Sequence, residues 1–310
     1  MNNYGIGFQG SKSRLAERII DLLPSATHLY DLFCGGGAIS HCALLSGKWK
    51  CVHFSDISDS VVLFRDCLEG NIPDGSEWIS REEFYKRKDK DPYVRIAWSF
   101  GNNQRDYLYS REIEPYKKAV HEMLYAPTPN ERRLKFKEVC RLMEKVKCRP
   151  CDLEFAEKSE RLNSLKMGGV CTKLQSFEAT NRLVGIADSR TTGADGRGAT
   201  PFFKGEHEMK VADYRDIDIL PDSVIYCDIP YKGTREYRND AFDHDAFYEW
   251  ALRQTAPLFI SEYDMPSDFV CIAEIPRTST FSATNNALKK TERIFVPKGQ
   301  YEMYKEMMKK

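Results

Sequence analysis

The segment 29–56 carries the pattern that most constrains the fold of this chain. Residues 29–33 form an apolar run that leads into Gly35-Gly36-Gly37 and then into a predicted helix. Glycines let the backbone approach a ligand closely, and the N–H groups at the start of the helix then face that ligand. A second predicted strand is followed by Asp56, about twenty residues after the glycines, where an acid suits ribose hydroxyls. The third glycine of the dinucleotide fingerprint is missing, so the segment predicts a nucleoside site and disfavours a nicotinamide cofactor.

A second informative pattern, Asp228-Ile229-Pro230-Tyr231, follows an apolar run. The Asp228 carboxylate and the Ile229 carbonyl can each accept one hydrogen of an exocyclic amine, and the Tyr231 ring can stack on a flat heterocycle. Asp and Pro after a strand are also ordinary turn residues, so the tetrad by itself is equally consistent with a turn that binds no ligand. Together with the glycine loop, it indicates a site for an amino-bearing nucleobase.

Alternating apolar strands and amphipathic helices favour an α/β fold with a mostly parallel, Rossmann-like sheet. Helices are predicted over 11–23, 38–47, 58–69 and 245–256, and strands over 29–33, 51–55, 209–211, 224–226, 258–260, 270–273 and 294–296. This order of predicted elements assigns 1–74 and 205–310 to one domain and leaves 75–204 as an inserted, mainly helical region.

These motifs, in this order, resemble the N6-adenine-specific DNA methyltransferases of the DNA adenine methylase type, particularly phage-borne members. The matching segments are 10–14, 31–37, Asp56, 213–214, 228–231, 259–263 and 291–296. The resemblance implies S-adenosylmethionine as methyl donor, an antiparallel last strand, and a target-recognition role for the insert on double-stranded DNA. One departure is Ile229, where the family usually has proline; the carbonyl is kept, but one restraint on the loop is absent.

The resemblance also assigns roles to individual residues. The catalytic tetrad is Asp228 to Tyr231, and Asp56 takes the ribose hydroxyls of the donor. The remaining donor contacts are Phe8 and Lys12 in the N-terminal motif, Asp31, Phe33, Gly35, Gly37, Ala38 and Ile39 around the methionine portion, and Asp213 and Tyr214 beside the adenine ring. For Asp213, a surface turn acid is the alternative role, because Asp216 and Asp218 lie close in sequence.

The insert carries a strongly basic run over residues 132–149, with eight Lys or Arg against two Glu. Such a run predicts contacts to DNA phosphates, although a solvated helix face has the same composition. Asn102 and Asn103 could meet bases or the sugar-phosphate backbone, or simply pack a helical lobe. The glycine-rich stretch 182–201 is either a connector or a segment that orders on DNA. The DNA-binding candidates are therefore Arg132, Arg133, Lys135, Lys137, Asn102 and Asn103.

Composition agrees with a cytoplasmic protein of a bacterial or phage-infected cell. The 310 residues can bury a full core, the formal net charge is zero, and the ten cysteines suggest free thiols in a reducing compartment. No apolar stretch reaches the ~20 residues that span a bilayer, and the N-terminus has no signal-peptide character. Cys140, Cys148, Cys151 and Cys171 could form a zinc site, but only Cys148 and Cys151 have ligand spacing, so no metal is predicted.

The predicted reaction needs orientation more than covalent catalysis. Acceptors at Asp228 and Ile229 would draw the amino nitrogen of a flipped adenine towards tetrahedral geometry, so that its lone pair can meet the methyl group. His28, His41 and His53 are predicted to be structural or exposed, since the transfer needs no histidine.

Two alternatives stay open: methyl transfer to another planar amine or amide, such as RNA adenine or protein glutamine, and a non-catalytic DNA-binding relative. The target sequence is not predicted; GATC is only common in the family.

Overall fold

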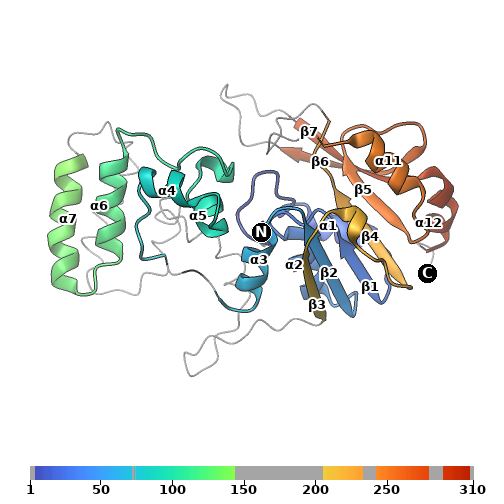
Figure 1. Cartoon of the computed structure of the whole chain (residues 1–310), viewed down its shortest axis with the longest axis horizontal. Helices are drawn as coiled ribbons and strands as arrows, with labels where there is room; N and C mark the ends of the chain where they lie inside the picture. The colour runs from blue at the N-terminus through green and yellow to red at the C-terminus, as the bar shows by residue number, and fades with distance from the viewer. Residues whose placement is uncertain are drawn as a thin grey trace. The chain divides into compact units, whose positions relative to one another are not determined.

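The computed structural model of the chain describes residues 4–71, 73, 75–143, 205–232, 242–278 and 289–307 (Figure 1). The chain forms two compact units. The first draws on Met1–Ile6, Gly10–Glu69 and Asp188–Lys310, and the second on Gly7–Gln9 and Gly70–Ala187. The second unit therefore interrupts the first in sequence. Among the described residues, no helix has the length and apolar character needed to cross a membrane.

The first unit is built on a seven-stranded sheet with the order β3-β2-β1-β4-β5-β7-β6 (Figure 1). The pairs from β3 to β5 are parallel, and β7 runs antiparallel to both β5 and β6, which confirms the mostly parallel sheet with a reversed last strand. The strands are β1 (His28–Asp31), β2 (Cys51–Asp56), β3 (Glu206–Val211), β4 (Ser223–Asp228), β5 (Leu258–Glu262), β6 (Phe269–Thr278) and β7 (Lys289–Pro297).

Helices cover both faces of this sheet, because parallel strands need crossover connections. Phe54 of β2 packs against Phe64 of α3, with ring centroids 5.1 Å apart, whereas Tyr30 of β1 belongs to a buried cluster with Phe247 of α11. Side chains alternate along a strand, so these two contacts lie on opposite faces. The helices of this unit are α1 (Ala16–Leu22), α2 (Ala38–Ser46), α3 (Ser60–Leu68), α11 (His244–Leu252) and α12 (Tyr301–Met307).

The helix predicted over 11–23 is wrong at its start, since α1 begins only at Ala16. The Ser13 hydroxyl accepts from the Tyr4 N–H at 2.7 Å, and the Lys12 side chain reaches Asp228, so both residues serve tertiary contacts instead of a helix turn. The helix predicted over 245–256 ends earlier, at Leu252, and the sequence did not predict α12.

The described part of the second unit is helical. Ser80 and Asp91 cap α4 (Arg81–Arg87) and α5 (Pro92–Ala97) by accepting backbone N–H groups, as short polar residues do before a helix. A one-turn 3-10 segment, η1 (Phe100–Asn102), follows. Helices α6 (Glu114–Leu124) and α7 (Pro129–Met143) then bury a shared apolar cluster of Tyr116, Ala119, Val120, Met123 and Val139.

Candidate active site

Three adjacent strands of the first unit each end on an aspartate. Asp31 closes β1, Asp56 closes β2 and Asp228 closes β4. Since β2, β1 and β4 are parallel neighbours, their carboxyl ends meet at one edge of the sheet, where ligands of open α/β sheets bind. All three are residues that the sequence predicted for the site, and the structure brings them together at this edge.

The loop after β1 fixes the Asp56 carboxylate. The Gly35 N–H donates to one Asp56 oxygen and the Ser58 N–H to the other, both at 2.8 Å. Gly37 begins α2 in the left-handed conformation, with φ 73°, and a Cβ there would lie 2.4 Å from the Phe64 ring. Glycine at position 37 is therefore required by backbone conformation and by packing. Ala38 and Ile39, in the first turn of α2, are buried.

Asp31 is a buried acid in this cluster, only 1% exposed. Its carboxylate accepts the Ser40 hydroxyl proton at 2.6 Å. Burial, helped by the charges of Asp228 and Asp56, raises the pKa of Asp31 to about 7, although the Ser40 hydrogen bond lowers it. Carboxylates that oppose each other's ionisation make this edge favourable for a cation.

Asp228 is 21% exposed and forms an ion pair with the buried Lys12 side chain. The Lys12 ammonium lies 2.6 and 2.8 Å from the two Asp228 oxygens, 3.7 Å from Glu292 Oε1 and 4.7 Å from the centre of the Tyr231 ring. The side chains of Lys12 and Glu292 are 4% and 0% exposed. Burial raises the pKa of Asp228, and the Lys12 charge opposes that rise. The structure thus places Lys12, predicted as a donor contact, on the carboxylate of the tetrad.

Neighbouring residues hold the rest of the tetrad. The Tyr231 hydroxyl donates to Glu292, and its ring meets Tyr263 edge-on, with centroids 4.5 Å apart. The Lys232 N–H donates to Glu262 at 3.1 Å, and His244 Nε2 lies 2.9 Å from the Pro230 carbonyl oxygen. Sequence reasoning missed Glu262, Glu292 and His244 as parts of this site. For Glu262, a charged residue at the end of the apolar strand β5 was the available signal, whereas Glu292 lies among other charged residues of β7 and gave none.

Ile229, at the position where proline is usual, is 1% exposed and packs in the core cluster that contains Phe247. The buried side chain anchors this turn to the core. Anchoring by packing therefore replaces the backbone restraint that proline would provide.

An aromatic group lies beyond the end of β1. The Phe33 ring is 5.3 Å from the Tyr214 ring, which in turn is 5.0 Å from Trp250. Asp213 caps the short helix η4 (Tyr214–Asp216) and pairs with Arg215 at 2.8 Å, and that pairing lowers the pKa of Asp213. Ile57, directly after Asp56, is 69% exposed and was not predicted as a site residue. A large apolar side chain held in solvent beside Asp56 is a candidate surface for a flat ring.

The predicted DNA contacts belong to the second unit, as does Phe8. Arg132 lies 3.5 Å from the Leu124 carbonyl oxygen, Lys135 pairs with Glu122 at 2.5 Å, and Lys137 is exposed. Asn102 donates to the Ile96 carbonyl and Asn103 to Asp106, so both amides shape the loop after α5. Several predicted positions lie outside the described residues: the Arg133 and Cys140 side chains, the stretch 182–201, Cys148, Cys151 and Cys171.

Comparison with known proteins identifies the class of enzyme. The family model described as D12 class N6 adenine-specific DNA methyltransferase matches residues 8–150, a segment that holds the glycine loop, Asp31, Asp56 and helices α1 to α7. No curated protein matches the chain. The sheet order and the aspartates at the strand ends agree with this match, so the chain is similar, over residues 8–150, to the D12 class N6 adenine-specific DNA methyltransferases.

Proposed function

We propose that this DNA adenine methyltransferase uses S-adenosylmethionine and acts on an adenine flipped out of a specific double-stranded DNA sequence. The observation that carries the proposal is the position of the acceptor tetrad, whose Asp228 shares one sheet edge with Asp31 and Asp56. Donor and acceptor groups must meet within a few ångströms for a direct transfer, and adjacent strand ends provide that proximity.

The residues at this edge fit the proposed donor. S-adenosylmethionine, when bound, supplies a methyl group on a positively charged sulfur, and it also carries an ammonium group. Asp31 and Asp56 offer the negative charge that such a cation needs, and both Asp56 oxygens are already oriented by backbone N–H groups. Asp56 would hold the ribose hydroxyls, and Ile57, Phe33 and Tyr214 offer apolar surface to the adenine ring.

The first prediction concerns the pH dependence of donor binding. Asp31 is ionised only above its pKa of about 7, and a cation binds the ionised form better. Donor affinity should therefore rise with pH between about 5.5 and 7, by at most about tenfold per pH unit. Asp31→Asn keeps a partner for Ser40 but cannot ionise, so it should bind more weakly and without this rise. Calorimetric titration at several pH values measures donor affinity and its change with pH in both proteins. An unchanged pH profile in the variant would assign the titration to another group.

The tetrad supports the acceptor half of the proposal. Asp228 and the Ile229 carbonyl would accept the two N6 hydrogens, and the half-buried Tyr231 ring would stack on the base. Lys12 contacts both Asp228 oxygens, and each oxygen has a second acceptor site, so the amine can join Lys12 on one oxygen or replace it there. Glu292, 3.7 Å away, can keep the ammonium paired during this exchange. Lys12 would thus keep Asp228 ionised and oriented until the base arrives.

The acceptor class can be tested directly. Protein incubated with S-adenosylmethionine labelled in the methyl group should transfer label to double-stranded DNA, and digestion of that DNA should yield N6-methyladenine. RNA and protein serve as parallel substrates in the same experiment. Label found in RNA or in glutamine, with none in DNA, would overturn the DNA assignment. Sequencing of the methylated DNA then gives the target sequence.

We further propose that α7 contacts DNA phosphates, and Lys137 gives the cleanest test. This lysine is exposed, whereas Lys135 and Arg141 already pair with glutamates. Lys137→Gln should weaken binding equally for cognate and scrambled duplexes, and it should reduce the log–log salt slope by about 0.9, the value for one phosphate. Binding isotherms at several salt concentrations measure both effects. Lys86→Gln on α4, an exposed lysine that lies 4.0 Å from Glu83 and outside the basic run, is the control. Equal slopes in the two variants would make α7 an ordinary solvated face.

A further inference from the structure

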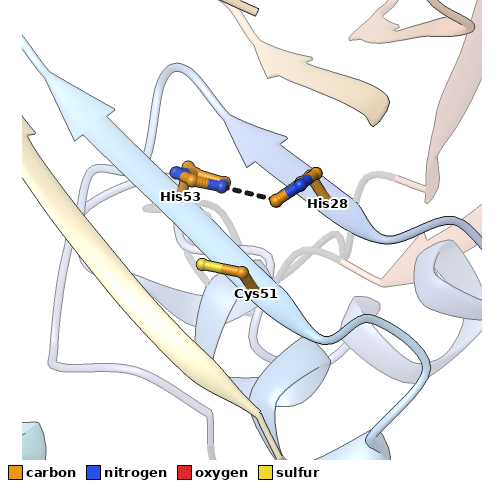
Figure 2. A group of neighbouring side chains, drawn as sticks. All are labelled: His28, Cys51 and His53. Carbon is orange, nitrogen blue, oxygen red and sulfur yellow. Dashed lines mark hydrogen bonds between the residues drawn. The ribbon is translucent and has the colours of Figure 1, made fainter. Parts of the chain in front are cut away.

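A second group of metal-ligating side chains lies at the opposite end of the strands from the active site. His28 is the first residue of β1, Cys51 is the first of β2, and His53 follows two residues later (Figure 2). One nitrogen of each imidazole and the Cys51 sulfur lie within 4.8 Å of one another. His28 and Asp31 are three strand steps apart, or about 10 Å, so this group is separate from the carboxylate edge.

The strand register explains why these three side chains meet. His28 pairs with Cys51 across the parallel strands, and Tyr30 pairs with His53. Paired residues and residues two apart along a strand share one face of a sheet. Figure 2 shows the two imidazoles pointing towards each other, joined by the hydrogen bond between His28 Nδ1 and His53 Nε2 at 2.9 Å.

A carboxylate and a ring hold His53 in the orientation that a metal ligand needs. Its Nδ1 lies 3.0 Å from Glu208 Oε2 of β3, and its ring stacks on Tyr30, with centroids 4.3 Å apart and planes 5° apart. A proton on Nδ1, donated to Glu208, leaves the Nε2 lone pair directed at His28 and Cys51. A histidine with its second nitrogen donated to a carboxylate is the usual arrangement around a protein-bound metal.

We propose that His28, Cys51 and His53 bind one zinc ion, with Glu208 as the positioning residue and a fourth position open to water. Two imidazole nitrogens and a thiolate are ligands that zinc prefers. Ligand atoms about 2.0–2.3 Å from zinc lie roughly 3.3–3.8 Å apart in a tetrahedral site, so the imidazoles must separate slightly and the sulfur must close in. The thiol proton leaves on binding, and the His28 proton moves to its other nitrogen. The ion would join the starts of two strands and take no part in methyl transfer.

Cobalt(II) is the probe, because a thiolate ligand gives an intense charge-transfer band and tetrahedral geometry gives strong visible bands. The full-length protein, stripped with a chelator, should bind one cobalt per chain with both signals, and zinc should displace it. Cys51→Ser should lose the charge-transfer band. Cys271→Ser, which changes an exposed cysteine on β6, should keep it. Failure of the wild-type protein to bind cobalt stoichiometrically overturns the proposal.

Two more variants keep the test decisive if Cys51→Ser folds poorly. The Glu208 side chain is 66% exposed, so Glu208→Gln should leave folding intact yet weaken metal affinity by about 10–100-fold, while the affinity for S-adenosylmethionine stays unchanged. A combined Cys148→Ser and Cys151→Ser variant tests the other pair of cysteines with zinc-ligand spacing. If this variant loses the charge-transfer band while Cys51→Ser keeps it, the metal belongs to those cysteines and the proposal is wrong. Unchanged affinity in Glu208→Gln would equally contradict it.

Discussion

Replacing Asp228 with alanine should lower the rate of methyl transfer by at least about 100-fold, while S-adenosylmethionine binds nearly as tightly as before. The reason is the proposed division of the site. Asp228 would orient the acceptor amine, whereas Asp31 and Asp56 would face the donor. Single-turnover transfer of labelled methyl groups to DNA measures the rate, and calorimetry measures donor affinity.

The Asp228 experiment needs controls because Asp228 also neutralises Lys12. In the alanine variant the buried ammonium keeps Glu292, at 3.7 Å, and the Tyr231 ring, but loses its nearest carboxylate, so thermal unfolding must be compared with that of the wild-type protein. Asp228→Asn keeps one acceptor oxygen and should retain more activity than the alanine variant. Asp218→Ala removes an exposed acid and should leave the rate unchanged. A near-normal rate in folded Asp228→Ala protein would refute the role given to the tetrad.

Replacing Asp56 with alanine should weaken S-adenosylmethionine binding by about 1.5–3 kcal/mol, the range for hydrogen bonds to a charged group. This weakening corresponds to roughly a 10-fold to 150-fold higher Kd. DNA affinity should hardly change, since Asp56 lies at the proposed donor end of the site. Calorimetric titration with the donor and binding isotherms with DNA separate the two effects.

Asp56 also accepts from the Gly35 and Ser58 N–H groups, so alanine removes loop support together with the proposed contact to the methyl donor. Asp56→Asn distinguishes these roles, because an amide oxygen can still accept from one N–H group but carries no charge. If donor affinity is unchanged in Asp56→Ala, the residue serves only to cap the end of β2. Weak binding in the alanine variant with full recovery in the asparagine variant would show that loop geometry, not charge, is what the donor requires.

Local sequence patterns predicted well the half of the sheet that carries Asp31 and Asp56. The alternation of apolar runs, glycines and helix, followed by Asp56, depends on contacts between residues close in sequence, and the structure has the predicted elements at 28–68 to within a few residues. The start of α1 was predicted wrongly because Lys12 and Ser13 are drawn into tertiary contacts, which outweigh helix propensity.

The interactions around Asp228 could not be predicted from the sequence. Lys12 is 216 residues from Asp228, and their contact depends on which strands become neighbours in the sheet. Glu262 and Glu292 look like surface acids until β5 and β7 pair. The cluster of His28, Cys51 and His53 was hidden for the same reason, since only the register of β1 against β2 brings it together.

The sheet order also means that the candidate active-site edge does not depend on the order of the elements along the gene. Asp31, Asp56 and Asp228 are brought together by lateral pairing of β2, β1 and β4, and the chain segments between these strands supply none of the three carboxylates. In a circularly permuted enzyme, the original termini are joined and the chain is opened in another connection so that β4 precedes β1. Such an enzyme would keep the same three carboxylates side by side. Connectivity in this fold is thus free to vary in evolution or by design, provided that strand adjacency is preserved.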